Sequence, residues 1–440
     1  MTSDWRSYPF ELVPGDSQLD FPAAEGQHPD QESDTWFIAG ELASEDRSFA
    51  FLTIFNRNRP GGSVVADFYT LGLFDLDTGE YGTYTDYDMP PASAQPGATP
   101  KMSSAVGHLE VSYDTGAGIA RWATMRDTGG ALRPYTYDIS LVGTDQAGRS
   151  MRLDLTVTPT RAPTPLGAAT HNGMIACFGQ DDTYSYFQTG MAMAGTLHWA
   201  DTQEQVTGTA GHVDRQWFPK YAGGGTGEPP RTRSHEWRTI NFDNGVDMSI
   251  WRQFLRTEGN ALQPFTGITT SYPDARSPQC AEDFDVAVTS YVRWPDGIRT
   301  LIRPPRKARY MPDRHRITCA ALGLDIVGEP LVAAPAHGLP IEYMEGPYRY
   351  RGTLAGEPVT GFAFNERSLA MYRDWELIEV LACAGTDDPD IRAAAEQLTS
   401  LLAAGHRHEA LALVSKVRSG RREPVATILD DLSTALRQPG

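Results

Sequence analysis

A short stretch at residues 207–221, TGTAGHVDRQWFPKY, gathers side chains that could do acid–base chemistry. His212 and Asp214 are two residues apart, so on a strand they project to the same face. The same spacing recurs in His235 and Trp237, on the next predicted strand. Antiparallel pairing of these strands in register would bring the four side chains together. If that face is turned to solvent instead, the polar pair is only a structural feature of the sheet.

The chemistry that this group offers is proton transfer in apolar surroundings. A buried carboxyl group keeps its proton to higher pH because burial penalises the charged form. Asp214 could therefore donate a proton near neutral pH, while His212 or His235 orients or deprotonates water. The indoles of Trp217 and Trp237 would supply apolar walls and a π-face for a cation. This set of groups suits acid chemistry on an unsaturated, hydrocarbon-like substrate.

The elements that must position these residues read as β-strands over most of the chain. From residue 35 onward, aromatic and β-branched segments recur about every 8 to 14 residues, with turn sequences between them. The 42 glycines and 31 prolines are typical of a chain with many turns. A second series of similar cadence begins near residue 206, and no crossover helices intrude. The sequence therefore predicts a mainly β chain of two consecutive antiparallel barrels, each able to enclose a small ligand.

The texture of the sequence changes after Gly385, where the apolar spacing becomes helical. Asp388 is a candidate N-cap, and Pro389 suits the first position of a helix. This short helical tail is expected to pack on the barrels or on a second copy of the chain, giving a homodimer. We thus expect four parts: an N-terminal arm at 1–30, a first barrel at 31–205, a second barrel at 206–384 and a helical segment at 385–440.

Composition excludes several classes of partner. The 38 basic and 56 acidic residues give a net charge of −18, which repels nucleic-acid phosphates and anionic lipids. The chain has neither an apolar run of about 18 residues nor a recognisable signal peptide, so a soluble cytoplasmic protein is expected. The four cysteines make no CxxC pair, and neither a metal-binding nor a nucleotide-binding motif occurs. We therefore predict no metal and no cofactor.

Four stretches together resemble the AttH/carotenoid 1,2-hydratase family, whose members have two consecutive lipocalin-like barrels. The stretches are DTWFIAGEL at 34–42, VTGTAGHVDRQW at 206–217, HEWRTINFDNG at 235–245 and YMEGPYRYRGTLAGEPVTGFAFNE at 343–366. In the second stretch, Asp214 and Trp217 match the pattern of the family, whereas His212 stands where the family carries an aromatic residue. The resemblance covers roughly residues 34–380 and leaves the helical tail outside.

The resemblance implies an apolar, unsaturated small molecule held between the two barrels. For a hydratase or dehydratase, it implies that Asp214 protonates a C=C bond and that Trp217 and Trp237 stabilise a tertiary carbocation. His212 or His235 would then position or deprotonate water. Alternatives are a cyclase of a polyene, including a pericyclic one, and a non-enzymatic carrier of an apolar ligand. Further candidates for substrate contact, each with a structural alternative in a core or hairpin, are Trp36, Tyr186, Tyr343, Glu345 and Glu366.

Overall fold

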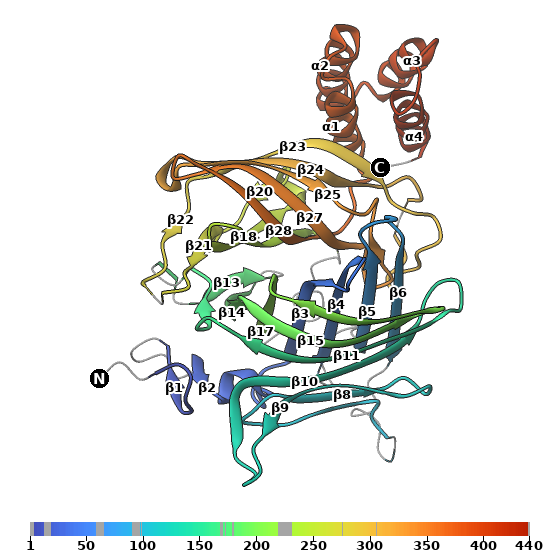
Figure 1. Cartoon of the computed structure of the whole chain (residues 1–440). Coiled ribbons are helices and arrows are strands. Elements are labelled where there is room, and N and C mark those ends of the chain that lie inside the picture. The colour runs from blue at the N-terminus through green and yellow to red at the C-terminus, as the bar shows by residue number, and fades with distance from the viewer. Residues whose placement is uncertain are drawn as a thin grey trace.

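The computed structural model confirms a mainly β chain of two antiparallel sheets followed by helices (Figure 1). It describes residues 4–12, 19–58, 66–89, 97, 99–167, 170–171, 173–177, 180–218, 231–274, 276–304 and 306–438. Within these residues the two large sheets have 15 and 11 strands, and each curves into an open barrel. Residues 219–230, which include the sequence YAGGGTGEPP, and the side chain of Cys177 lie outside the described part.

The first barrel, β3 to β17, carries the hydrogen-bonded order β12-β14-β17-β3-β16-β15-β11-β10-β9-β8-β7, with β4, β5 and β6 extending from β3 and β13 pairing with β14. Its strands are β3 (Ser33–Ala43), β4 (Ser48–Asn58), β5 (Asp67–Asp75), β6 (Tyr81–Asp88), β7 (Met102–Ser104), β8 (Glu110–Asp114), β9 (Ile119–Arg126), β10 (Leu132–Thr144), β11 (Ser150–Pro159), β12 (Thr164–Pro165), β13 (Met174–Cys177), β14 (Gln180–Thr189), β15 (Met191–Trp199), β16 (Thr202–Gly208) and β17 (Gly211–Phe218). Strand β17, which was expected to open the second barrel, instead pairs with β3 and β14 of the first.

The second barrel, β18 to β28, carries the order β22-β21-β19-β18-β28-β27-β25-β24-β23, with β20 pairing with β19 and β26 with β27. Its strands are β18 (Arg233–Phe242), β19 (Asp247–Leu255), β20 (Ala261–Leu262), β21 (Gly267–Ser271), β22 (Cys280–Ala281), β23 (Asp285–Arg293), β24 (Tyr310–Cys319), β25 (Leu324–Pro330), β26 (Ala336–His337), β27 (Tyr343–Leu354) and β28 (Glu357–Ser368).

Several strands of the first barrel are apolar on both faces, and the packing of the two barrels explains why. Strand β5 is buried along its whole length, and β4 is buried at all but two positions. One face of β4 enters the core of the first barrel through Phe51 and Phe55. The other face packs against the second barrel. The residues of this contact layer include Phe37, Leu52, Ile54, Phe68, Phe74, Val332, Leu339, Phe362 and Phe364.

Polar contacts also join the barrels around this apolar layer. Arg349 Nη2 donates to Glu41 Oε1 at 2.7 Å, and Tyr81 Oη donates to the carbonyl of Ala334 at 3.1 Å. The two barrels therefore meet through their outer faces rather than through their interiors, and they stack one over the other in Figure 1.

The N-terminal segment is not the separate polar arm that we expected at residues 1–30. Strands β1 (Phe10–Glu11) and β2 (Asp20–Phe21) form a small pair, and Trp5, Leu19 and Phe21 are buried in the core of the first barrel. The apolar residues in this proline-rich stretch are few, but each one is large enough to fill the end of the barrel.

Arg215 on β17 fixes this segment in place. Its guanidinium is fully buried and donates to the carbonyls of Glu25, Gly26 and Thr35. It also pairs with the Asp34 carboxylate at 2.9 Å. The N-terminal segment, β3 and β17 are therefore held together by one side chain.

Four helices complete the chain: α1 (Asp374–Ala384), α2 (Pro389–Ala403), α3 (Arg407–Arg418) and α4 (Val425–Arg437). The helical part begins earlier than the expected residue 385, because α1 directly follows β28 and packs on β23. The Asp388 side chain caps α2 as predicted, accepting from the backbone N–H groups of Asp390 and Ile391. No described helix has the length and apolar character needed to cross a membrane.

Replacing Arg215 with Met is expected to destabilise the protein by about 3 to 5 kcal/mol, because it leaves the Asp34 charge buried without its partner. The measurement is urea denaturation followed by tryptophan fluorescence. Arg152→Met is the matched control, since the Arg152–Asp154 pair is largely exposed and contributes at most about 1 kcal/mol. Equal midpoints for the two variants would contradict the role assigned to Arg215.

Candidate active site

The cavity that brings titratable side chains together lies between the two barrels. Its volume is about 80 Å³. Strands β3, β4, β5 and β17 of the first barrel face β18, β27 and β28 of the second barrel across it. The apolar lining residues are Phe37, Ile54, Phe68, Trp237 and Leu339. The polar lining residues are Thr35, Asn56, Asp214, Gln216, His235, Tyr343 and Glu366.

The two-residue alternation of β17 decides which of its side chains reach the cavity. Asp214 and Gln216 line the cavity, and His212 on the same face pairs with Asp214 through Nε2 and Oδ2 at 3.3 Å. The intervening Arg215 and Trp217 point the opposite way, into the core of the first barrel. One short strand therefore supplies both an anchor and a reactive group.

The second barrel contributes a row of side chains across three neighbouring strands. Trp237 of β18 lies opposite Glu366 of β28, and Glu366 lies opposite Glu345 of β27. The Trp237 indole N–H donates to Ser249 Oγ at 2.7 Å, which fixes the plane of its ring. Trp251 on β19 packs edge-on against it, with ring centroids 5.1 Å apart. The indole at the cavity wall is therefore held rigidly.

His235 and Glu366 form a hydrogen-bonded pair at the cavity wall. The Nε2 atom of His235 contacts Glu366 Oε1 in a short hydrogen bond. The hydroxyl of Ser368 accepts from the backbone N–H of His235 and lies 2.9 Å from its Nδ1 atom. Because that hydroxyl can donate to Nδ1, the arrangement favours a proton on Nε2 that His235 donates to the carboxylate.

Asp214 is the carboxyl group best placed to act as an acid. Burial raises its pKa, the pairing with His212 opposes that rise only in part, and the charge of Glu366 adds to it. Its Oδ1 atom is buried and has no hydrogen-bond partner among the described residues. A neutral carboxyl with one uncommitted oxygen can present a proton to a molecule in the cavity.

Glu345 is a third buried acid beside this pair. Burial raises its pKa well above the usual carboxyl range, and the charges of Glu366 and Asp214 raise it further. Its Oε2 atom, too, lacks a hydrogen-bond partner within the described part of the chain. Nearby, burial lowers the pKa of His337 to about 4, so that ring is neutral and donates from Nε2 to the Glu345 carbonyl at 2.8 Å.

The arrangement places two carboxyl groups with different partners in one cavity. Burial raises the pKa of Asp214, whereas Glu366 accepts a hydrogen bond from the His235 imidazole. Trp237 lies in the same wall and offers a π-face. Among the described residues, no three His, Cys, Asp or Glu side chains come together in a way that could hold a metal ion.

Three of the residues expected to contact substrate lie elsewhere. Trp217 stacks on His28 with ring centroids 3.9 Å apart, and Arg215 lies over the Trp36 ring at 4.1 Å. Tyr186 packs edge-on against Trp217. All three belong to the core of the first barrel. The core alternative is therefore confirmed for Trp36 and Tyr186, and the expected substrate contact of Trp217 is wrong. An odd spacing from Asp214 puts Trp217 on the opposite face of the strand.

The expected residues His212, Asp214, His235 and Trp237 do lie in one region, but not through strand pairing. Strands β17 and β18 belong to different sheets and face each other across the contact between the barrels. Sequence reasoning missed Gln216, although it continues the alternation from His212 and Asp214. It also missed the walls from β3, β4 and β5, which carry no motif. Tyr343 and Glu366 line the cavity, whereas Glu345 is adjacent to Glu366 without lining it.

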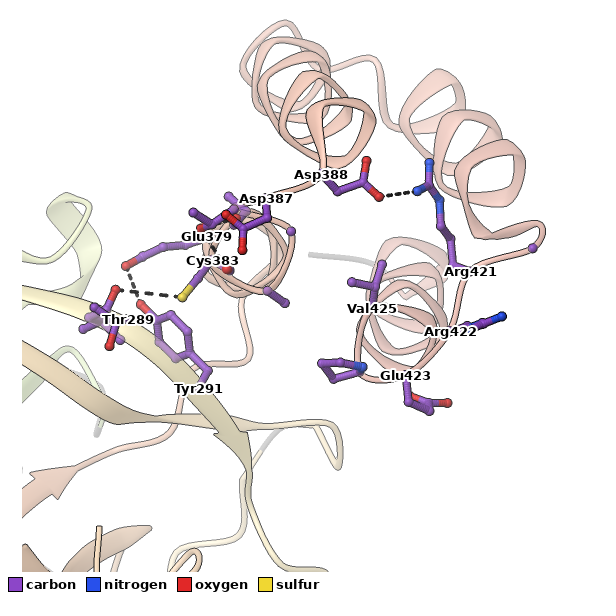
Figure 2. Close-up of a pocket in the computed structure, with 17 residues that line it drawn as sticks. Thr289, Tyr291, Glu379, Cys383, Asp387, Asp388, Arg421, Arg422, Glu423 and Val425 are labelled. Carbon is purple, nitrogen blue, oxygen red and sulfur yellow. Dashed lines mark hydrogen bonds and ion pairs between the residues drawn. The ribbon is translucent and has the colours of Figure 1, made fainter. Parts of the chain in front are cut away.

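A larger groove of about 1110 Å³ lies between β23 and the C-terminal helices (Figure 2). Two of its carboxylates are already engaged, since Asp388 pairs with Arg421 and Glu379 accepts a hydrogen bond from Tyr291 at 2.7 Å. Burial also raises the pKa of the Cys383 thiol, which makes it a poor nucleophile. This groove offers space but no acid–base pair, so we assign the reactive chemistry to the cavity between the barrels.

Comparison with known proteins shows which family and which solved structures this chain is similar to. A family model described as AttH-like matches residues 98–366. None of the curated proteins matches the chain in sequence. The chain is similar to a crystal structure of a candidate AttH protein from Nitrosomonas europaea, with a TM-score of 0.58 and 17% identity, over 81% of this chain and 98% of that one. It is also similar to kievitone hydratase from Nectria haematococca, with a TM-score of 0.54 and 14% identity, over 79% and 92% of the two chains.

Glu345→Gln is expected to raise stability at pH 8 and to leave it unchanged near pH 4. The raised pKa of Glu345 means that the folded state binds more protons than the unfolded state above the usual carboxyl range, so native stability falls there as pH rises. The Gln variant has no group that titrates at this position, so its stability should not fall with pH for this reason. Thermal unfolding of the variant and of the unaltered protein at pH 4 and pH 8 measures the difference in their stability. An equal difference at the two pH values would refute the prediction.

Proposed function

This chain belongs to the AttH-like family, and on that premise we propose that it is a hydratase or dehydratase that protonates a C=C bond of an apolar, isoprenoid or polyunsaturated small molecule. The observation that carries the proposal is the buried Asp214 carboxyl, which shares an apolar cavity with the His235–Glu366 pair and Trp237. One protein with a similar fold is named as a hydratase, which agrees with this reaction class.

Addition of water follows from the roles of these groups. Asp214 gives its proton to one alkene carbon, and the neighbouring carbon becomes a carbocation. Trp237 stabilises the cation through its π-face. Water forms the new C–O bond and releases a proton to Glu366, whose orientation His235 maintains. The proton returns from Glu366 to Asp214, so the net reaction is addition of water across the double bond, and its reverse is dehydration.

The size of the cavity supports a branched alkene end as the reacting part of the substrate. A cavity of about 80 Å³ suits the reacting end of a substrate together with the attacking water. A branched end also yields a tertiary cation on protonation. Tyr343 and Gln216 are the proposed contacts to the part of the substrate nearest the cavity mouth.

Asp214→Asn is expected to reduce turnover by about 10²- to 10⁴-fold, because the amide cannot supply the proton. The assay incubates the protein in ¹⁸O-labelled water with apolar compounds that end in a trisubstituted alkene, and mass spectrometry detects the labelled alcohol. Activity of the unaltered protein should fall as pH rises through the raised pKa of Asp214. Full activity of the variant would refute the mechanism.

The same assay separates hydration from the alternatives. A cyclase or isomerase would convert the substrate without taking up ¹⁸O. A carrier would bind the compound without converting it, and Asp214→Asn would not change its affinity. At neutral pH the Asn variant should unfold at a temperature no lower than that of the unaltered protein, since it removes a carboxyl whose ionisation burial disfavours.

Trp237→Leu is expected to lower kcat by about 2- to 30-fold, the loss expected for a cation–π contact of about 0.5 to 2 kcal/mol. Trp237→Phe, which keeps a weaker π-face, should give an intermediate loss. Trp217→Phe is the matched control, because Trp217 packs in the core of the first barrel and should affect stability but not kcat. Equal kcat values for Trp237→Leu and Trp237→Phe would refute the role of the π-face.

A further inference from the structure

The interior of the second barrel contains a group of three arginines with a single carboxylate between them. Arg238 and Arg367 are buried, and the Arg252 side chain is 14% exposed. All three guanidinium groups pair with the same buried carboxylate, Glu236, at 2.9, 3.0 and 3.5 Å. One carboxylate therefore serves three arginines, and their charges pull the pKa of Glu236 well down despite its burial. We call these four residues the arginine cluster.

Other charged groups near the arginine cluster do not balance it. Asp285, which interacts with Arg252, lies at the exposed start of β23. Asp313 lies near Tyr348 on the neighbouring strands, where burial raises its pKa, and Arg314 rather than a cluster arginine is the cation beside it. The adjacent Arg256–Glu376 pair adds one charge of each sign. Unbalanced buried charge is costly, so a network that served only structure would be expected to match its charges.

Several donors in and around the cluster are also uncommitted. The Nε atoms of Arg238 and Arg367 are buried and lack hydrogen-bond partners in the described residues. Both ring nitrogens of His315 and the hydroxyl of Tyr348 are also buried, and they too lack a hydrogen-bond partner within the described part of the chain. His315 lies beside Tyr348, with ring centroids 6.3 Å apart. Burial lowers the pKa of His315 well below its usual value, and the arginine charges lower it further. Its single proton is therefore another neutral donor.

Arg215 shows what a buried structural arginine looks like in the same protein. Its Nε, Nη1 and Nη2 atoms all donate, to backbone carbonyls and to Asp34. The arginine cluster differs in its charge balance, because one carboxylate serves three guanidinium groups. Buried polar groups without partners are rare and call for a specific explanation. Guanidinium groups that converge on one point suit a carboxylate or a phosphate, which accept from several donors at once.

From these contacts we propose that the arginine cluster binds a small oxyanion inside the second barrel. Its location is separate from the cavity between the barrels, because β18 presents Glu236 and Arg238 on one face and His235 and Trp237 on the other. The cluster lies behind β23, where Arg252 Nη1 donates to the Val286 carbonyl. The ligand is either the carboxylate of an organic acid or inorganic phosphate.

The large groove at the C-terminal helices lies on the other side of β23. Tyr291 and Val288 line this groove, and the charge of Arg367 acts on the Tyr291 hydroxyl. Figure 2 shows Tyr291 directed toward Glu379 of α1, at the wall that separates the groove from the barrel. Strand β23 is therefore the element that lies between the arginine cluster and the groove.

The test is titration of the full-length protein with sodium phosphate and, separately, with sodium acetate, at constant ionic strength maintained with sodium chloride. Calorimetry and the thermal unfolding midpoint are the two measurements. We expect one of the two anions to bind saturably and to raise the midpoint, which identifies the source of the oxyanion. Equal, non-saturating effects of phosphate, acetate and chloride would overturn the proposal.

Arg252→Gln is the variant of choice because Arg252 is partly exposed and makes the longest of the three contacts with Glu236. It should weaken binding of the anion at least tenfold. Arg252→Lys keeps the positive charge but loses the planar guanidinium that can donate two parallel hydrogen bonds, so it should weaken binding less. It also provides a second measurement of affinity if the Gln variant is unstable. Arg314→Gln is the matched control on the outer side of β24, and it should bind as the unaltered protein does. Unchanged affinity in both Arg252 variants would overturn the proposal.

Discussion

Burial of β17 on both faces is the constraint on which the rest of the structure depends. One face is held by Arg215, which ties the N-terminal segment and β3 to the strand through backbone carbonyls and Asp34. The other face carries Asp214 into the contact between the barrels. Because adjacent side chains of a strand point in opposite directions, fixing Arg215 also fixes Asp214. The candidate acid is thus positioned by a core interaction that has no chemistry of its own.

The second barrel repeats this division on β18. His235 and Trp237 face the cavity between the barrels, whereas Glu236 and Arg238 face the interior. The first face carries carboxyl groups, and burial raises the pKa of two of them, Asp214 and Glu345, whereas the second face is rich in arginine. Two regions of opposite electrostatic character are therefore separated by the thickness of one sheet. A net charge of −18 gives no hint of this division, because a sum over the whole chain carries no information on where the charges lie.

The parts of the fold that could be predicted are those that depend on local periodicity. Strand alternation indicated a mainly β chain, and Asp388 followed by Pro389 indicated the start of α2. The expected arm at residues 1–30 was wrong because three large apolar side chains suffice to anchor a proline-rich segment to a core. The strand Gly211–Phe218 was expected in the second barrel because its place along the chain says nothing of its partners. Pairing over long sequence separations joins it to β3 instead.

The sequence by itself determined which faces of β17 and β18 carry Asp214, His212, His235 and Trp237, because a period of two is a local property of any strand. It did not determine that these strands belong to different sheets, nor that Phe37, Ile54 and Phe68 close the cavity around them. It also could not place Trp217 in the core of the first barrel or gather three arginines around Glu236. Only tertiary packing decided these points, because they depend on which outer face meets which and on the free energy of burying charge where two sheets exclude water.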